Sequence, residues 1–192
     1  DGTITLTEEL HYRAFAQIFK EYGIDFSYQD QLKRFAGSGS NVIFPRVFAE
    51  HGVEVSAEDI GKCIERKRDL YKKIVQESPI PMVEGVQEFV KRVSDAGLKL
   101  IIATGNGSLD SVRFILEKIS LLSYFPLIVS VQEVPHGKPF PDVFLEAARR
   151  ISCQPQDCVV IEDSANGVEA ATRGLFRCIA LETTTPAADL NK

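Results

Sequence analysis

In the second half of the chain, apolar runs alternate with segments of helical periodicity, and this pattern most restricts the possible folds. Strands separated by helices pair in parallel, because a crossover helix returns the chain to the end of the sheet at which the previous strand began. The pattern therefore predicts an α/β fold whose parallel sheet core carries helices on both faces. The expected strands are "LKLIIA", "PLIVSV", "CVVIE" and "FRCIAL", and the expected helices are 84–96, 108–119, 141–151 and 165–173.

Residues before this region predict a separate, all-helical block. Thr7 is followed by two glutamates and by apolar residues at helical spacing, which favours a helix from Thr7 to about Tyr22. No stretch from 28 to 76 has the pattern of a strand, and the prolines of "ESPIPM" disfavour a continuing helix. Further helices are expected at 29–36, 40–51 and 56–76. We expect one domain from residues 1–8 and 82–192, and an inserted helical cap domain with its linker at 9–81.

Composition excludes several classes of partner. A net charge of -5 and a pI near 5.3 disfavour nucleic acid, whose phosphates are bound by clustered Lys and Arg. No apolar stretch reaches about 18 residues, so no membrane span is expected. The spacing of Cys153 and Cys158 fits no common zinc pattern, and Cys63 and Cys178 lie far from both. We expect these cysteines to be buried or unreactive thiols, and we expect a cytoplasmic location.

Polar residues follow the apolar runs, where an open α/β sheet binds its ligands. "LIIATGN" places Thr104 at a strand end, and Gly105 exposes backbone N–H groups to an anionic oxygen, although such a turn more often only ends a strand. "HGKPFPD" places Lys138 on a loop stiffened by two prolines, where its ammonium could hold a phosphate and a neighbouring carboxylate. A solvated surface lysine is the alternative.

Two adjacent carboxylates, Glu162 and Asp163, end the run "VVIE". On a strand buried on both faces they repel each other and lose hydration unless a cation joins them. Mg2+ suits such a place, because it takes one or two carboxylates and keeps several waters. The alternative is that Asp163 or Ser164 merely caps the following helix.

In this order, "DGT", "TGN", "GKPFPD" and "IEDS" resemble the four-motif signature of the haloacid dehalogenase-like hydrolase superfamily. The helical insert after the first motif resembles the cap of the subgroup that holds β-phosphoglucomutase and many small-molecule phosphatases. The resemblance covers essentially the whole chain, and its third and fourth motifs are the most specific. It implies a Rossmann-like core and Mg2+-dependent phosphoryl transfer through an aspartyl-phosphate.

The first motif of that family reads Asp-x-Asp-Gly-Thr, and Asp1 matches its second aspartate. The nucleophilic aspartate would lie two positions upstream, on a first strand that would also precede Asp1, so we expect the natural chain to include both. As printed, the chain should be catalytically inactive. The resemblance implies the following roles: Asp1 as acid/base and, by its carbonyl, a metal ligand; Thr104, Gly105 and Asn106 as phosphoryl-binding groups; Lys138 as a bridge from phosphate to nucleophile; Asp163 as a metal ligand; and Glu162 as the holder of a metal-bound water.

Two segments of the cap region bear on the substrate. "HYRAF" with His11 and "ERKRDLY" with Lys67 resemble the corresponding segments of β-phosphoglucomutase, which implies substrate-binding roles for both and a phosphosugar-like ligand. A helix-surface histidine and a solvated charged face are the alternatives. Ser40 stands approximately where the mutase carries a phosphate-clamping arginine, and this weakens the mutase interpretation.

We therefore predict a monomeric, Mg2+-dependent phosphatase of a small phosphorylated metabolite, such as a sugar or polyol phosphate. A sugar phosphomutase is the alternative enzyme, and a dehalogenase is disfavoured because it would need neither Asp1 nor the metal. A catalytically inactive relative that only binds a phosphometabolite is the alternative from another class. The residue two places before Asp1 would distinguish this inactive relative from an enzyme, because an enzyme needs aspartate there.

Overall fold

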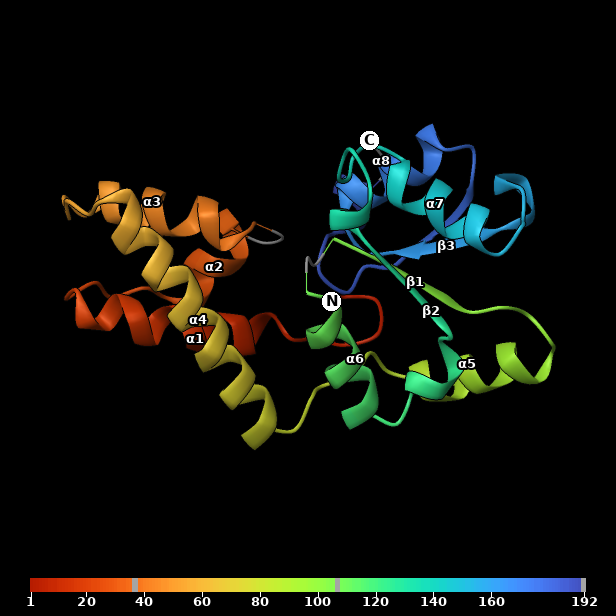
Figure 1. Ribbon diagram of the computed structural model, residues 1–192, viewed down its shortest axis with the longest axis horizontal. Helices are drawn as coiled ribbons and strands as arrows, with labels where there is room; N and C mark the ends of the chain where they lie inside the picture. Colours follow the sequence, from red (N-terminus) through yellow and green to blue (C-terminus); the bar gives the residue numbers. More distant parts are fainter. Residues whose placement is uncertain (36–37, 106–107, 191–192) are drawn as a thin grey trace. The chain divides into compact units, whose positions relative to one another are not determined.

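The computed structural model describes residues 1–35, 38–105 and 108–190 (Figure 1). The chain forms two compact units, one from Asp1–Leu6 together with the residues from Ile80 onward, and one from Thr7–Pro79. The division falls after Leu6 and Pro79, whereas the predicted boundaries fall after residues 8 and 81. None of the described helices is both long and apolar enough to cross a membrane.

The unit Thr7–Pro79, called the helical unit, contains the helices expected from the sequence. Thr7 occupies the N-cap position of the first, and the Ser56 hydroxyl caps the last by accepting a hydrogen bond from the Asp59 N–H. No strand occurs among its described residues. The helices are α1 (Glu8–Glu21), α2 (Tyr28–Phe35), α3 (Ser40–Glu50) and α4 (Ala57–Glu77).

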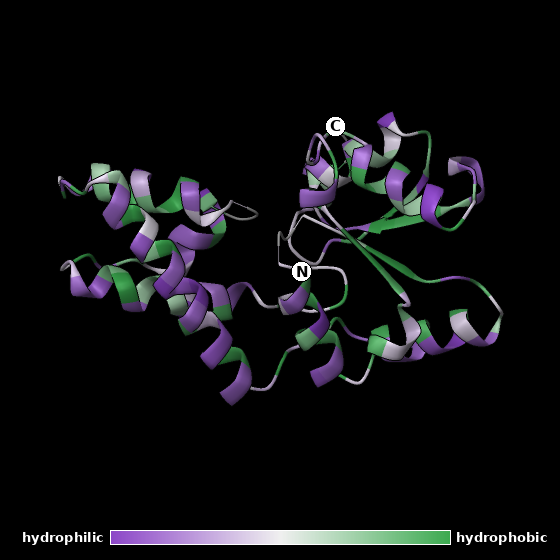
Figure 2. Ribbon diagram, viewed as in Figure 1, coloured by the Kyte–Doolittle hydropathy of each residue, from purple (hydrophilic) through white to green (hydrophobic). Residues whose placement is uncertain are grey.

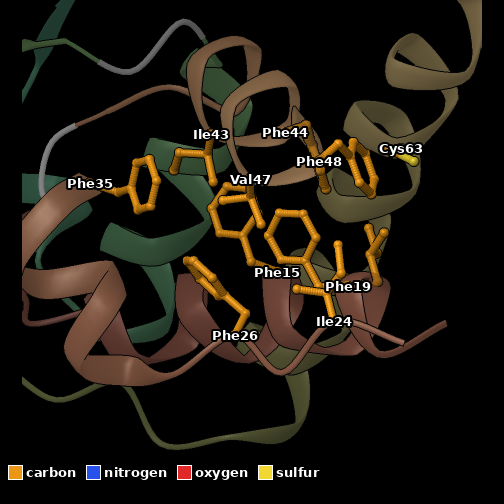
Figure 3. Packing of buried hydrophobic residues seen from close by; sticks show 11 residues of the cluster. Phe15, Phe19, Ile24, Phe26, Phe35, Ile43, Phe44, Val47, Phe48 and Cys63 are labelled. Carbon is orange, nitrogen blue, oxygen red and sulfur yellow. The ribbon is translucent and has the colours of Figure 1, made fainter. Parts of the chain in front are cut away.

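An aromatic core holds this unit together (Figure 3). Phe19 is fully buried, and its ring centroid lies 4.9 Å from that of Phe26, 5.2 Å from that of Phe44 and 5.5 Å from that of Phe48. Tilted and edge-on rings at these separations attract each other beyond the effect of burial alone. The core consists of Phe15, Ile18, Phe19, Ile24, Phe26, Phe35, Ile43, Phe44, Val47, Phe48 and Cys63.

Removal of the Phe19 ring is expected to destabilise this core strongly. Phe19→Ala should lower the free energy of unfolding of the helical unit by about 3–5 kcal/mol, because it loses both buried area and ring contacts. Urea unfolding followed by far-UV circular dichroism measures the change. Leu32→Ala is the control, because Leu32 is 43% exposed and should lose less than about 1 kcal/mol. Equal losses in the two variants would contradict this packing.

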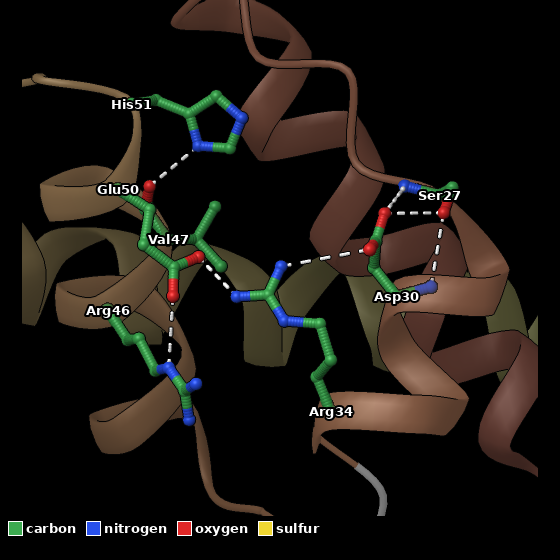
Figure 4. A network of polar contacts seen from close by, with 7 residues as sticks. All are labelled: Ser27, Asp30, Arg34, Arg46, Val47, Glu50 and His51. Atoms are coloured by element: carbon green, nitrogen blue, oxygen red, sulfur yellow. Dashed lines mark hydrogen bonds and ion pairs between the residues drawn. The ribbon is translucent and has the colours of Figure 1, made fainter.

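A surface network of charges joins α2 to α3 (Figure 4). Arg34 pairs with Glu50 across the two helices and lies 3.7 Å from Asp30 within α2, while Arg46 donates to Glu50 at 3.1 Å. Asp30 also accepts a hydrogen bond from the Ser27 hydroxyl. These groups are substantially exposed, so the network contributes little stability compared with the aromatic core.

The other unit, called the α/β unit, contains parallel strands against which helices pack. The elements are α5 (Val86–Asp95), β1 (Ile101–Thr104), α6 (Leu109–Lys118), β2 (Leu127–Ser130), α7 (Asp142–Arg150), β3 (Val159–Glu162), α8 (Ala165–Arg173), β4 (Arg177–Ala180) and α9 (Ala187–Leu190), with 3-10 turns η1 (Leu122–Tyr124), η2 (Val131–Glu133) and η3 (Pro155–Asp157). Helix α7 packs on β1 and β2, α8 packs on β3 and β4, and α6 packs on β2. Strands β1, β2 and β3 are coloured mainly as hydrophobic in Figure 2, whereas β4 is mostly exposed.

Parallel pairing confirms the predicted fold class, but within the described residues it forms two separate pairs. β1 pairs with β2, so that Thr104 lies opposite Ser130, and β3 pairs with β4, so that Glu162 lies opposite Ala180. The segment Asp1–Leu6 is not a strand of either pair. It turns at Gly2, whose N–H donates to the Thr5 carbonyl, and Thr5 makes an isolated antiparallel bridge to Met82.

The run "LKLIIA" enters the sheet later than predicted. β1 begins at Ile101, and Leu98 is 64% exposed. The backbone at Gly97 has a φ of 75°, and the Leu98 N–H donates to the Val93 carbonyl at 3.2 Å. These features complete the end of α5, so Leu98 belongs to the helix terminus rather than to the strand.

Candidate active site

The two carboxylates predicted at the end of β3 are both buried. Glu162 is 6% exposed and Asp163 is 8% exposed. The following helix is capped by neither of them, because the Ser164 hydroxyl is the group that accepts a hydrogen bond from the Gly167 N–H, at 3.1 Å. Capping is therefore the role of Ser164, and the Asp163 carboxylate is left for other contacts.

Glu162 is held by a lysine and by the backbone of the following turn. Its Oε1 accepts a hydrogen bond from the Lys138 ammonium, and its Oε2 accepts from the Asp163 N–H at 3.0 Å and from the Ser164 N–H at 3.1 Å. Burial alone would raise the pKa of Glu162, but the Lys138 charge and these hydrogen bonds outweigh burial and lower it. Glu162 is therefore ionised at neutral pH.

Asp163 is held by threonines from both ends of the unit. The Thr3 hydroxyl donates to its Oδ1 at 2.9 Å, although 160 positions separate the two residues, and the Thr184 hydroxyl donates to its Oδ2. Gly2 approaches the same carboxylate so closely that an added Cβ would lie 1.8 Å from Oδ2. Its φ of 73° also favours glycine. The first and fourth motifs therefore meet at Asp163.

Lys138 is a part of this cluster and not a solvated surface lysine. Its side chain is 18% exposed, and its ammonium lies 4.8 Å from the centroid of the Phe144 ring while it donates to Glu162. The loop of the third motif thus brings a cation to the end of β3. An ammonium on a stiff loop acts as a fixed point charge that can also attract an anionic ligand.

Gly167, on the first turn of α8, packs directly against the Glu162 carboxylate. A Cβ at Gly167 would lie 2.1 Å from the carboxyl carbon of Glu162, so Gly167→Ala should displace that side chain and destabilise the α/β unit by about 1–3 kcal/mol. Gly61→Ala in α4 is the matched control, because nothing lies within 4 Å of its added Cβ and alanine favours helix by up to about 1 kcal/mol. Chemical denaturation compares them, and equal stability changes would contradict the close approach.

The remaining site residues predicted in the α/β unit lie at the end of β1 and at the start of the chain. Thr104 ends β1 and is half-buried, Gly105 is exposed, and Asp1 is exposed at the start of the chain. Asn106 lies outside the described residues. A shared approach of these groups to Glu162 and Asp163 stays a prediction.

Sequence reasoning missed Thr183 and Thr184. Besides its bond to the Asp163 carboxylate, Thr184 donates to the Asp163 carbonyl at 3.2 Å, and Thr183 donates to the Gly2 carbonyl. The stretch "ETTTP" lies after the last strand and has no periodicity that would mark it as part of a site. Only its return to Gly2 and Asp163 in the folded chain identifies it.

Oxygen atoms are the potential metal donors of this cluster. In the described part of the chain, no group of three or more His, Cys, Asp or Glu side chains could by itself hold a metal ion. Asp163 and Glu162 supply adjacent buried carboxylates. Such a donor set suits a hard cation that keeps part of its water shell.

The two residues predicted in the helical unit, Lys67 and His11, contact each other. Lys67 is 8% exposed, its Nζ lies 2.8 Å from Nδ1 of His11 and 4.5 Å from the centroid of the Phe15 ring, and the His11 ring stacks on Tyr71 at 4.0 Å. Burial lowers the pKa of Lys67 to about 8. Burial, followed by the Lys67 charge, lowers the pKa of His11 well below its usual value. Lys67 is therefore not on a solvated charged face.

Known proteins resemble this chain in sequence and in fold. The sequence profile of the family described as "Haloacid dehalogenase-like hydrolase" matches residues 1–181. A "Phosphorylated carbohydrates phosphatase" of Thermotoga maritima is 29% identical over 89% of this chain and 76% of its own length. The β-phosphoglucomutase of Bacillus subtilis is 27% identical over 92% of this chain and 78% of its own length. The crystal structure of CbbY from Rhodobacter sphaeroides in complex with phosphate matches with a TM-score of 0.81 at 24% identity, over 100% of this chain and 96% of the other.

Proposed function

This chain belongs to the haloacid dehalogenase-like hydrolase family, and from that premise we propose that it is a Mg2+-dependent phosphatase of a small phosphorylated carbohydrate. The observation that carries the proposal is the cluster at the end of β3. There, a buried carboxylate pair, a lysine from the third motif and threonines of the first motif and the C-terminal region are joined by hydrogen bonds. Phosphoryl transfer needs charges of both signs held in fixed positions around one phosphate group.

The residues of this cluster fit Mg2+ by the chemistry of their oxygens. Asp163 would be the direct ligand, the Asp1 carbonyl a second one, and Glu162 the holder of a bound water. The close approach of Gly2 to Asp163 leaves no room for a side chain, as a compact oxygen-lined cradle requires. When bound, Mg2+ would neutralise charge on the oxygens of the phosphate group.

The other roles fall to residues of this chain. Lys138, fixed by Glu162, would hold a phosphate oxygen by charge, and the Thr104 hydroxyl with the Gly105 and Asn106 backbone would bind other oxygens at the end of β1. Asp1 would donate a proton to the leaving group and later accept one from water. The aspartate nucleophile, two positions before Asp1 in the family motif, would form the aspartyl-phosphate that divides hydrolysis into two displacements.

The proposed substrate class comes from the helical unit and from the named relatives. Lys67 and His11 offer a cation and a hydrogen-bonding ring, which suit the hydroxyl and phosphate groups of a sugar or polyol phosphate. The Thermotoga maritima relative is named for phosphorylated carbohydrates. Mutase activity is the second candidate, favoured by the Bacillus subtilis relative and disfavoured by Ser40 in place of a phosphate-clamping arginine.

Phosphate release from a panel of sugar and polyol phosphates, with and without Mg2+, tests the proposal. Two proteins are assayed: the chain as printed, and an extended chain, called the completed chain, in which a β-strand and an Asp-Xaa pair are joined ahead of Asp1. The completed chain should hydrolyse at least one panel member about 100-fold faster than the printed chain, because only it carries the nucleophile.

The matched control is the same graft with asparagine in place of its nucleophilic aspartate, which should be as inactive as the printed chain. Conversion of one hexose phosphate isomer to another without phosphate release would favour the mutase. A folded completed chain that binds panel members without turning any of them over would overturn the phosphatase proposal in favour of a binding protein.

A further inference from the structure

The turn at 182–184, directly after β4, brings two consecutive threonines to the first and fourth motifs. The Thr184 hydroxyl donates to the backbone carbonyl of Asp163, at 3.2 Å, and to Oδ2 of the same residue. The Thr183 hydroxyl donates to the Gly2 carbonyl. We call Thr183 and Thr184 the threonine clamp. One residue of the clamp thus contacts the fourth motif, and the other contacts the first.

The backbone on both sides of the threonine clamp is held by the fold. Before the turn, the Leu181 N–H donates to the Glu162 carbonyl at 2.7 Å, which continues the pairing of β4 with β3. After the turn, α9 packs on α8, and its Leu190 is 4% exposed. The clamp hydroxyls therefore belong to a segment that is anchored at both ends, so they lose little freedom when they reach their acceptors.

Thr184 restricts the orientation of the Asp163 carboxylate. A hydroxyl that bonds to both the carbonyl and the carboxylate of one residue limits the rotation of that side chain, and the Thr3 hydroxyl holds the other oxygen, Oδ1, at 2.9 Å. A carboxylate has about four lone-pair positions, so these donors leave acceptor capacity on each oxygen. The Asp163 carboxylate is therefore fixed and can still bind a cation.

Thr183 acts on the same carboxylate through the first motif. Its hydroxyl holds the Gly2 carbonyl, and the Gly2 N–H donates to the Thr5 carbonyl at 2.6 Å. Gly2 lies against Asp163, since an added Cβ would be 1.8 Å from Oδ2, and the next residue is Thr3, the donor to Oδ1. The placement of the first motif beside Asp163 thus depends on Thr183.

The charges around the two carboxylates differ. The Lys138 ammonium pairs with Glu162, whereas within the described part of the chain Asp163 accepts from neutral hydroxyl groups and forms no ion pair. Asp163 is 8% exposed, and a buried carboxylate without a cationic partner is costly. The clamp therefore orients a negative charge without neutralising it, as a ligand for a cation requires.

We infer that the threonine clamp positions the Asp163 carboxylate for the Mg2+ of the proposed site, so that Thr183 and Thr184 are positioning residues of the reaction. The inference rests on the proposed function, because it needs the cation at Asp163. Hydrogen-bond partners of a metal ligand fix its orientation, and their removal typically weakens metal binding about 10- to 100-fold.

Titration calorimetry of the chain as printed with Mg2+ tests the inference without any need for turnover. Thr184→Val keeps the shape of the side chain but removes its hydroxyl, and it should weaken Mg2+ binding about tenfold or more. Thr184→Ser restores the hydroxyl and should bind within about twofold of the parent. Thr185→Val is the matched control, because Thr185 adjoins the clamp but its hydroxyl bonds to neither motif among the described residues.

Urea unfolding without Mg2+ separates positioning from folding. Because Thr184 is exposed, Thr184→Val should leave the unfolding midpoint unchanged. Thr183→Val should likewise weaken Mg2+ binding, but less than Thr184→Val, since Thr183 acts through Gly2. It provides a second test if one variant does not fold.

Three outcomes would count against the inference. If Thr184→Val bound Mg2+ as tightly as the parent while Asp163→Asn lost it, the clamp would have no positioning role and the metal site would stand. Equal losses in Thr184→Val and Thr184→Ser would show that the hydroxyl is not the cause. If the parent chain itself bound no Mg2+, the inference and the Mg2+ dependence of the proposed function would fail together.

Discussion

Replacement of Asp163 by asparagine is expected to abolish Mg2+ binding by the chain and to lower phosphate release by the completed chain at least about 100-fold. Asp163 is buried, and Thr3 and Thr184 hold its two carboxylate oxygens in fixed positions. Asparagine keeps the shape and one acceptor oxygen, but it removes the negative charge that a hard cation needs. The fold should therefore survive while the site loses its cation.

Titration calorimetry with Mg2+ measures the first effect on the chain as printed, without any need for turnover. Asp157→Asn is the matched control, because Asp157 is exposed in the turn before β3 and should leave Mg2+ binding unchanged. If the Asp163→Asn variant bound Mg2+ as tightly as the parent, the metal would have to lie elsewhere. Binding lost with activity kept would instead contradict a Mg2+-dependent reaction.

Lys67→Met is expected to remove a pH dependence of the stability of the helical unit. The pKa of Lys67 is lowered by burial from 10.5 to about 8. Between these two values, the unfolded chain binds a proton that the folded chain does not, so stability rises with pH in this window. Below pH 8 both states carry the proton, and the full penalty of a buried ammonium is present.

The free energy of unfolding of the parent chain, relative to that of Lys67→Met, should therefore increase by about 3 kcal/mol from pH 7 to pH 10.5. Urea unfolding at a series of pH values measures this difference. Lys72→Met on the exposed side of the same helix should show no such trend. Parallel pH profiles for the parent and Lys67→Met would show that Lys67 keeps an ordinary pKa in the folded chain.

The same variant connects stability to substrate selection. An ammonium that destabilises the fold at neutral pH is expected to serve binding, since methionine would fill the site without this penalty. In the completed chain, Lys67→Met should raise KM for the preferred sugar phosphate more than it lowers kcat. An unchanged KM would contradict the proposed substrate role of Lys67.

Local patterns in the sequence were sufficient to predict most of the secondary structure of this molecule. The alternation of apolar runs with helical segments predicted parallel strands, and the apolar spacing after Thr7 predicted the first helix of the helical unit. The carboxylates at the end of "VVIE" and the lysine in "GKPFPD" were predicted to share a site, and the structure brings Lys138 and Glu162 into contact. These features depend on the period of each element and on the chemistry of a few residue types, and both are readable from neighbouring positions.

Only the tertiary structure decided which of several equivalent side chains has a given role. Ser164 caps α8 and Asp163 does not, and Lys67 is buried while Arg66 and Arg68 on the same turn are exposed. The contacts of Thr3 and Thr184 with Asp163, and the separation of the strands into two pairs, have no local signal. They arise from packing between segments distant in the chain, where burial and hydrogen-bond geometry, rather than residue type, determine the outcome.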